Sequence, residues 1–195
     1  MFNEQGFSRV SLRDISVRMG ISPGNLTYHY RNREELLKAI YEQMYGIMEA
    51  FYAREVRDPL EVLARIPQQS REFIHGYRFF FADLRAIAQE FPWLAERHQQ
   101  VVAKRLAGGE QLIKGLAALG HLHQEPFPGA YDHLVHLVWM VPTFWYNQHP
   151  VLPEGHPAHQ EDHLQSTLYV LIKPYLTEQG LEKWTQINNQ ENETD

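Results

Sequence analysis

The stretch SLRDISVRMGISPGNLTYHYRNREELL, Ser11 to Leu37, decides how this chain of 195 residues is interpreted. Ser11 stands as an N-cap before a run with helical apolar spacing, and Gly20 follows that run at the position where helices often end. Ser22 then caps a second helix, and Pro23 occupies its first position, where the missing N–H does no harm. The stretch therefore predicts two short helices joined by a tight turn that contains glycine.

A short helix, a glycine turn and a second short helix are the elements of a helix-turn-helix. Small and amide side chains at the start of the second helix suit close approach to base edges in a major groove. Leu26 is expected to face inward. The residues expected on the outer face are Ser22, Pro23, Gly24, Asn25, Thr27, Tyr28 and His29, flanked by Arg31 and Arg33. We predict a DNA-reading surface here, although such turns also occur in all-α enzymes and exposed aromatic side chains also line protein interfaces.

The rest of the chain predicts further helices. It has no sustained period-two alternation and no Asn-Gly or Asp-Gly hairpin turn. Asn32 caps a long third helix, and the helix that begins at Pro59 is expected to end early at Pro67, with another over 69–89. We expect an all-α chain with a helix-turn-helix DNA-binding domain over residues 1–45 and a helical effector-binding and dimerisation domain over residues 46–195.

Composition narrows the class of protein. The chain has no Cys, which excludes disulfides, Cys-ligated zinc, iron–sulfur clusters and thiol catalysis, and fits a cytoplasmic location. Residues 1–40 carry six basic and four acidic side chains, whereas the remainder carries 12 basic and 20 acidic ones. A basic head on an acidic body is typical of a small nucleic-acid-reading module joined to another domain, although so small an excess also arises by chance. No apolar run is long enough for a membrane span, and no catalytic motif is present, so we expect neither an enzyme nor a cofactor.

The N-terminal sequence also resembles a known family. The run from Gly20 to Leu36, preceded by Phe2 to Phe7 and by Ser11 to Ile15, closely resembles the DNA-binding domain of the TetR/AcrR family of bacterial transcriptional regulators. The resemblance implies a homodimer that binds a double-stranded DNA operator. It also implies a repressor that leaves this operator when a small-molecule effector binds the body.

The resemblance assigns roles to individual positions. It implies base reading by Ser22, Pro23, Gly24, Asn25 and Tyr28, and phosphate contacts by Ser11, Arg13, His29 and Arg33. The family commonly has a Tyr that contacts phosphate at the position of Thr27, and Thr has a shorter reach. The family also has most of a first helix before Phe2, whereas this sequence begins in the last turn of that helix; either the first helix is truncated here, or its other residues lie outside the given sequence. A head without that helix loses apolar cover for its small core and is expected to bind DNA weakly.

A helix-turn-helix protein reads two half-sites as a dimer, so the body is expected to supply a two-fold interface. The last two large helices each carry an apolar stripe, and paired helices of this kind build a four-helix bundle between subunits. The interface candidates are Leu134, Leu137, Val138, Val141, Trp145, Leu164, Leu168, Leu171, Ile172 and Tyr175. The alternative is that the same stripes form internal core.

The middle of the body is rich in aromatic residues with arginines between them. An apolar pocket with a few polar groups is what a small-molecule effector needs, although aromatic clusters more often fill cores. The candidates for effector contacts are Tyr77, Arg78, Phe81, Arg85, Trp93 and Trp139.

Two histidine pairs have helical spacing, His133 with His136 and His159 with His163. Such spacings place two ring nitrogens near one metal ion, but no neighbouring Glu or Cys completes a recognisable site. We therefore predict no metal. The alternative to a regulator is an all-α small-molecule- or metal-binding protein without DNA-binding activity, in which the aromatic, His-rich body is the working part.

Overall fold

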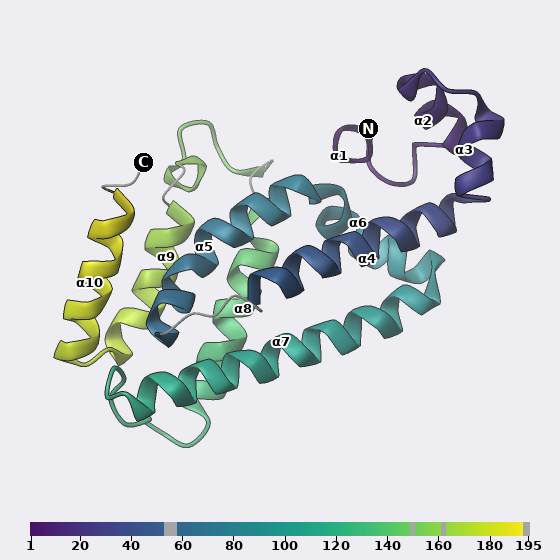
Figure 1. Cartoon of the computed structure of the whole chain (residues 1–195). Coiled ribbons are helices and arrows are strands. Elements are labelled where there is room, and N and C mark those ends of the chain that lie inside the picture. The colour runs from purple at the N-terminus through teal and green to yellow at the C-terminus, as the bar shows by residue number, and fades with distance from the viewer. Residues whose placement is uncertain (53–57, 149–150, 161–162, 193–195) are drawn as a thin grey trace. The chain divides into compact units, whose positions relative to one another are not determined.

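The computed structural model describes residues 1–52, 58–148, 151–160 and 163–192, and these are helical almost throughout (Figure 1). The α-helices are α1 (Phe2–Gln5), α2 (Leu12–Met19), α3 (Pro23–His29), α4 (Arg33–Tyr52), α5 (Pro59–Gly76), α6 (Arg78–Glu90), α7 (Pro92–Ala118), α8 (Ala130–Gln148), α9 (His163–Ile172) and α10 (Glu178–Asn192). The only β pairing among the described residues is an isolated antiparallel bridge between Leu122 and Leu176. The predicted all-α class is confirmed.

The chain divides into two compact units. The head unit comprises Met1–Glu55 and Gly76–Glu96, and the body unit comprises Val56–His75 and Arg97–Asp195. The head unit therefore contains α6 as well as the N-terminal helices. The expected boundary between residues 45 and 46 stays a prediction.

An aromatic cluster forms the core of the head unit. The Phe7 side chain is 0% exposed, and its ring centroid lies 5.1 Å from that of Phe2, 6.2 Å from that of Phe79 and 5.9 Å from that of Phe91. Aromatic pairs at these separations stabilise a core by more than the burial of their apolar surface alone. The cluster joins residues near the N-terminus to the two ends of α6, so the head unit closes around contacts that are distant in sequence.

The body unit has its own apolar core, supplied by α5 and by the helices from α7 to α10. Its buried side chains are Leu60, Leu63, Ala64, Ile113, Leu116, Leu122, Leu134, Val135, Val138, Ile172, Leu176, Trp184 and Ile187. Helices α8 and α9 pack against each other, as the two green ribbons show in Figure 1. No helix among the described residues is long and apolar enough to cross a membrane.

The expectation that Pro67 ends its helix early is wrong. Helix α5 continues through Pro67 to Gly76, and α6 begins only at Arg78. Buried side chains recur along one face of α5, at Leu60, Leu63, Ala64, Pro67 and Ile74. We attribute the continuity to burial of this stripe, which outweighs the hydrogen bond that a mid-helix proline removes.

Candidate nucleic-acid interface

Helix α2 begins at the predicted cap. The Asp14 backbone N–H donates to Ser11 Oγ over 3.2 Å, and the Ser11 backbone N–H donates to Asp14 Oδ2 over 2.9 Å. The Ser11 hydroxyl also donates to Asp14 Oδ2 over 2.6 Å, and these bonds from Ser11 hold the pKa of the Asp14 carboxyl below its ordinary value. The capping box is complete, so a phosphate at Ser11 would have to share a hydroxyl that already serves the helix.

The turn between α2 and α3 has the geometry that its glycine predicts. Gly20 has φ 68° and ψ 25°, in the left-handed region, and its N–H donates to the carbonyls of Ser16 and Val17. The next N–H, that of Ile21, donates to Ser16 O over 3.0 Å. Only glycine adopts this backbone without a steric penalty, so the tight change of direction before α3 depends on Gly20.

The outer face of helix α3 is exposed to solvent. Ser22 Oγ accepts the Asn25 N–H over 3.2 Å, and Pro23 occupies the first turn, as predicted. Leu26 is 5% exposed and turns inward, whereas Tyr28 is 84% exposed. The predicted DNA contacts that are exposed here are Ser11, Arg13, Ser22, Pro23, Gly24, Asn25, Thr27, Tyr28 and His29. The structure thus brings these predicted contacts together on one exposed stretch; their DNA-binding roles remain predictions.

Thr27 and Arg33 differ from the other predicted contacts. The Thr27 hydroxyl donates to the carbonyls of Pro23 and Gly24, 3.0 and 3.2 Å away, so its proton is used within α3. Arg33 is half-buried, and its Nη2 donates to the Phe7 carbonyl over 2.8 Å. The Arg33 side chain is therefore directed into the head unit.

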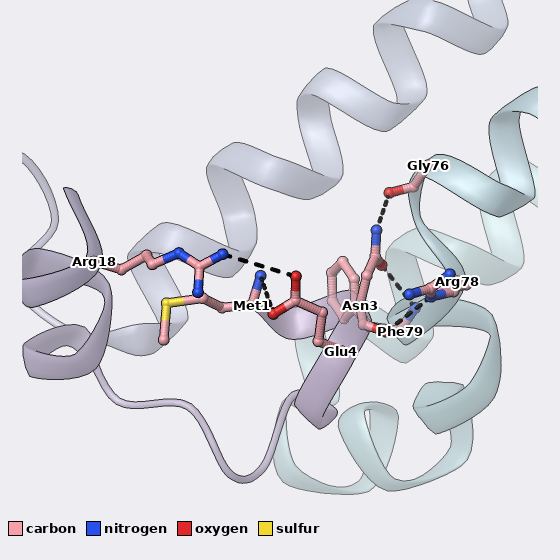
Figure 2. A network of polar contacts seen from close by, with 7 residues as sticks. All are labelled: Met1, Asn3, Glu4, Arg18, Gly76, Arg78 and Phe79. Atoms are coloured by element: carbon pink, nitrogen blue, oxygen red, sulfur yellow. Dashed lines mark hydrogen bonds and ion pairs between the residues drawn. The ribbon is translucent and has the colours of Figure 1, made fainter.

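The N-terminal segment is hydrogen-bonded to the start of α6 (Figure 2). The Asn3 side chain donates to Gly76 O over 2.6 Å and accepts the Phe79 N–H over 3.2 Å. Arg78 Nε donates to Asn3 O over 2.8 Å. Tyr77, the N-cap residue of α6, makes no side-chain capping bond, and the Asn3 side chain serves the Phe79 N–H at this helix end.

A second hydrogen bond fixes the same segment. The Phe7 backbone N–H donates to Asp83 Oδ2 over 3.1 Å. Sequence reasoning missed Asn3 and Asp83, because nothing in the local pattern indicates a pairing across more than seventy residues. By contrast, the ion pair of Arg18 with Glu4 spans 4.0 Å between exposed side chains and contributes little stability.

The six candidates for effector contacts do not lie in one unit. Tyr77, Arg78, Phe81, Arg85 and Trp93 belong to the head unit, and Trp139 belongs to the body unit. In the head unit, the Phe81 ring lies against Phe80, while Trp93 contacts the Tyr41 ring and the Lys38 ammonium. In the body unit, the Trp139 ring is 5.4 Å from that of His136. Their role in effector binding stays a prediction.

The candidates for a dimer interface fall into two classes. Leu134, Val138, Leu164, Leu168 and Ile172 are buried within a single chain, which leaves little of them for a partner. Leu137, Val141, Trp145, Leu171 and Tyr175 are half-buried, and their interface role remains a prediction.

Two exposed apolar residues on the same helices were not among the interface candidates. Phe144 on α8 is 47% exposed, and Val170 on α9 is 67% exposed. No signal in the sequence separates them from the buried stripe, since helix faces are assigned only once the packing is known. Among the described residues, no three His, Asp or Glu side chains converge as metal ligands.

Comparison with known proteins gives a consistent result. A family model described as "Bacterial regulatory proteins, tetR family" matches residues 1–40, and one described as "Bacterial transcriptional repressor" matches residues 41–184. No curated protein sequence matches the chain.

Solved structures share the fold. A TetR-family transcriptional regulator from Marinobacter aquaeolei VT8 has a TM-score of 0.80 at 23% identity, with 97% of this chain and 92% of that chain covered. A putative transcriptional regulator from Saccharomonospora viridis in complex with choline has a TM-score of 0.72 at 15% identity, covering 88% and 89%. The ketosteroid transcriptional regulator KstR2 of Mycobacterium tuberculosis has a TM-score of 0.60 at 18% identity, covering 91% and 90%.

Proposed function

Since this chain belongs to the TetR family of bacterial transcriptional regulators, we propose that it reads an operator as a homodimer and releases it when a small molecule binds the body. The observation that carries the proposal is the exposed face of α3 beside the left-handed turn at Gly20. Chromosomal DNA as the target implies action in the bacterial cytoplasm. The family assignment favours this function over a protein without DNA-binding activity.

Base reading is assigned to the outer face of α3. Asn25 offers an amide that pairs with an adenine edge, and the ring of Tyr28 suits a thymine methyl. The ring of Tyr28 lies beside that of His29, at 5.3 Å between centroids. Phosphate contacts are assigned to Ser11, Arg13 and His29, which flank the reading face and are exposed.

Replacing Tyr28 with Ala is expected to reduce the preference for the selected operator over scrambled DNA, because a base contact is worth about 1–3 kcal/mol. Arg13→Ala is expected to weaken both duplexes alike and to reduce the slope of log K against log salt by about 0.9 for each phosphate that the protein no longer neutralises. Fluorescence anisotropy with a duplex selected from a random pool measures both effects. Unchanged binding in both variants would contradict the assignment of α3 as the reader.

Dimerisation is assigned to the outer surface of α8 and α9. The exposed side chains of Phe144 and Val170 lie on these two packed helices, and exposed large apolar residues favour an interface. In an isologous interface of this kind, the same residues of both subunits take part, so each contact occurs twice, related by the two-fold axis. Such a dimer presents two α3 helices to two half-sites.

Val170→Glu is expected to give a monomer, since two buried carboxylates would face an apolar interface without partners. Sedimentation velocity at micromolar concentration measures the change. Leu119→Glu is the matched control, because Leu119 is also an exposed aliphatic residue but lies after the end of α7. A Val170→Glu protein that stays dimeric would place the interface elsewhere.

Effector binding is assigned to residues 46–195, which include the six candidates for effector contacts. The family membership and the choline complex of the Saccharomonospora viridis protein support a small-molecule ligand. Release of the operator requires only that the effector bind more tightly to a form of the dimer in which the spacing of the two heads does not fit the operator.

A further inference from the structure

We propose that Arg33 is a positioning residue, which holds the junction of α3 and α4 against Phe7 and does not contact phosphate. The inference rests on the proposed DNA-binding function. It replaces the phosphate contact that the family resemblance implies at this position with a contact inside the head unit.

The Arg33 guanidinium is engaged on two sides. Its Nη2 donates to the Phe7 carbonyl over 2.8 Å, and its Cζ lies 4.3 Å from the centroid of the Phe7 ring. A planar guanidinium stacks on a ring and donates in its own plane at the same time, whereas the ammonium of Lys has no such plane. Turning Arg33 toward a DNA phosphate would break both contacts and expose part of a buried ring.

The residue that Arg33 holds is itself fixed. The Phe7 N–H donates to Asp83 Oδ2 over 3.1 Å, and the Phe7 ring is fully buried among Phe2, Phe79 and Phe91. Phe7 is therefore a rigid anchor rather than a mobile side chain. A contact to Phe7 therefore restrains the element that carries Arg33.

Arg33 lies next to the reading helix. Arg33 is the first residue of α4, and α3 ends at His29, so three residues separate the contact from the reading helix. The link between them is short, and within it the Arg31 N–H donates to Glu35 Oε2 over 2.8 Å. Fixing Arg33 therefore limits the tilt of α3, on which the base contacts of Asn25 and Tyr28 depend.

Positioning and phosphate binding predict different defects. Base contacts need a well-defined geometry, whereas non-specific binding depends on phosphate charges and tolerates a tilt. Removing a positioning residue thus lowers the affinity for the selected sequence but spares the affinity for other DNA. Removing a phosphate ligand lowers both affinities alike and makes binding less dependent on salt.

The test compares Arg33→Ala, Arg33→Lys and Arg13→Ala with the wild-type protein. Each is titrated, at several salt concentrations, onto a duplex that the wild-type protein selects from a random-sequence pool and onto a scrambled duplex of the same composition. Thermal unfolding followed by circular dichroism reports whether each variant is folded. Arg13 is the matched control, since it is an exposed arginine of the same unit.

Arg33→Ala is expected to weaken binding to the selected duplex about tenfold, as the removal of a stacked, charge-assisted contact suggests, with binding to the scrambled duplex changed less than about twofold. The salt slope stays at the wild-type value, and Arg33→Lys behaves like Arg33→Ala. Arg13→Ala lowers the affinity for both duplexes and reduces the slope of log K against log salt by about 0.9 for each phosphate that is no longer neutralised.

Two results would overturn the proposal. In the first, Arg33→Ala lowers the affinity for both duplexes alike and makes the salt slope shallower, whereas Arg33→Lys restores the wild-type affinities. This result identifies Arg33 as a phosphate ligand. In the second, both variants unfold at lower temperature but keep the wild-type ratio of affinities, which identifies a role in stability alone. If Arg33→Ala does not fold, the ratio in Arg33→Lys decides. A wild-type protein without preference for any duplex refutes the DNA-reading function itself, before the variants are compared.

Discussion

Phe7→Ala is expected to cost about 3–5 kcal/mol of unfolding free energy and to abolish operator binding. The ring is 0% exposed, contacts the rings of Phe2, Phe79 and Phe91, and carries the Arg33 guanidinium on one face. Its removal leaves a cavity where residues near the N-terminus meet α6, and domains have only about 5–15 kcal/mol of stability in total.

Urea denaturation followed by far-UV circular dichroism measures the loss of stability, and anisotropy measures the loss of DNA binding. Phe127→Ala is the matched control, because Phe127 is 54% exposed. Its replacement is expected to change stability by less than about 0.5 kcal/mol, as is usual for surface positions. If Phe7→Ala costs no more than this control, the aromatic cluster does not hold the head unit together.

Gly180→Ala is expected to destabilise the body unit by about 1–3 kcal/mol or more, although Ala is the better helix former. A Cβ at Gly180 would overlap the carbonyl oxygen of His121 and lie 3.1 Å from its carbonyl carbon. The backbone of His121 cannot easily move away from Gly180, because two hydrogen bonds hold it to Thr177. The Thr177 N–H donates to His121 O over 3.0 Å, and the Thr177 hydroxyl donates to Gly120 O over 2.7 Å. Helix α10 would have to move away from the backbone of residues 120–123.

The midpoint of thermal unfolding tests this expectation, and amide hydrogen exchange along α10 locates the damage. Gly46→Ala is the control with the opposite sign, since Gly46 lies within α4 and a Cβ there would meet nothing within 4 Å. That variant is expected to gain up to about 1 kcal/mol from helix propensity. Equal stabilisation by both substitutions would show that α10 is not closely packed at Gly180.

The features that the sequence predicted are those governed by near neighbours. The caps at Ser11 and Ser22 and the left-handed turn at Gly20 are set by bonds spanning a few residues, and each is confirmed. A local pattern is sufficient there because one side chain and the next turn of helix contain the whole interaction.

The features that it missed depend on packing. Pro67 was expected to end α5, because the pattern does not reveal how much the buried stripe contributes. The stripe of α8 containing Leu134 and Val138 has the same spacing whether it packs inside one chain or between two. The hydrogen bonds of Asn3 to the start of α6 join residues more than seventy positions apart, which no periodicity records.

The bond between Phe7 and Asp83 also constrains the order of events during protein synthesis. The two residues are 76 positions apart, so the N-terminal segment is made well before its partner on α6. At about 5–20 residues per second, the interval is roughly 4–15 s. During that time the rings of Phe2 and Phe7 lack Phe79 and Phe91, so these apolar side chains are expected to stay without their folded-state partners. The DNA reader is therefore expected to mature only after the ribosome has passed α6, although its own helices are completed much earlier.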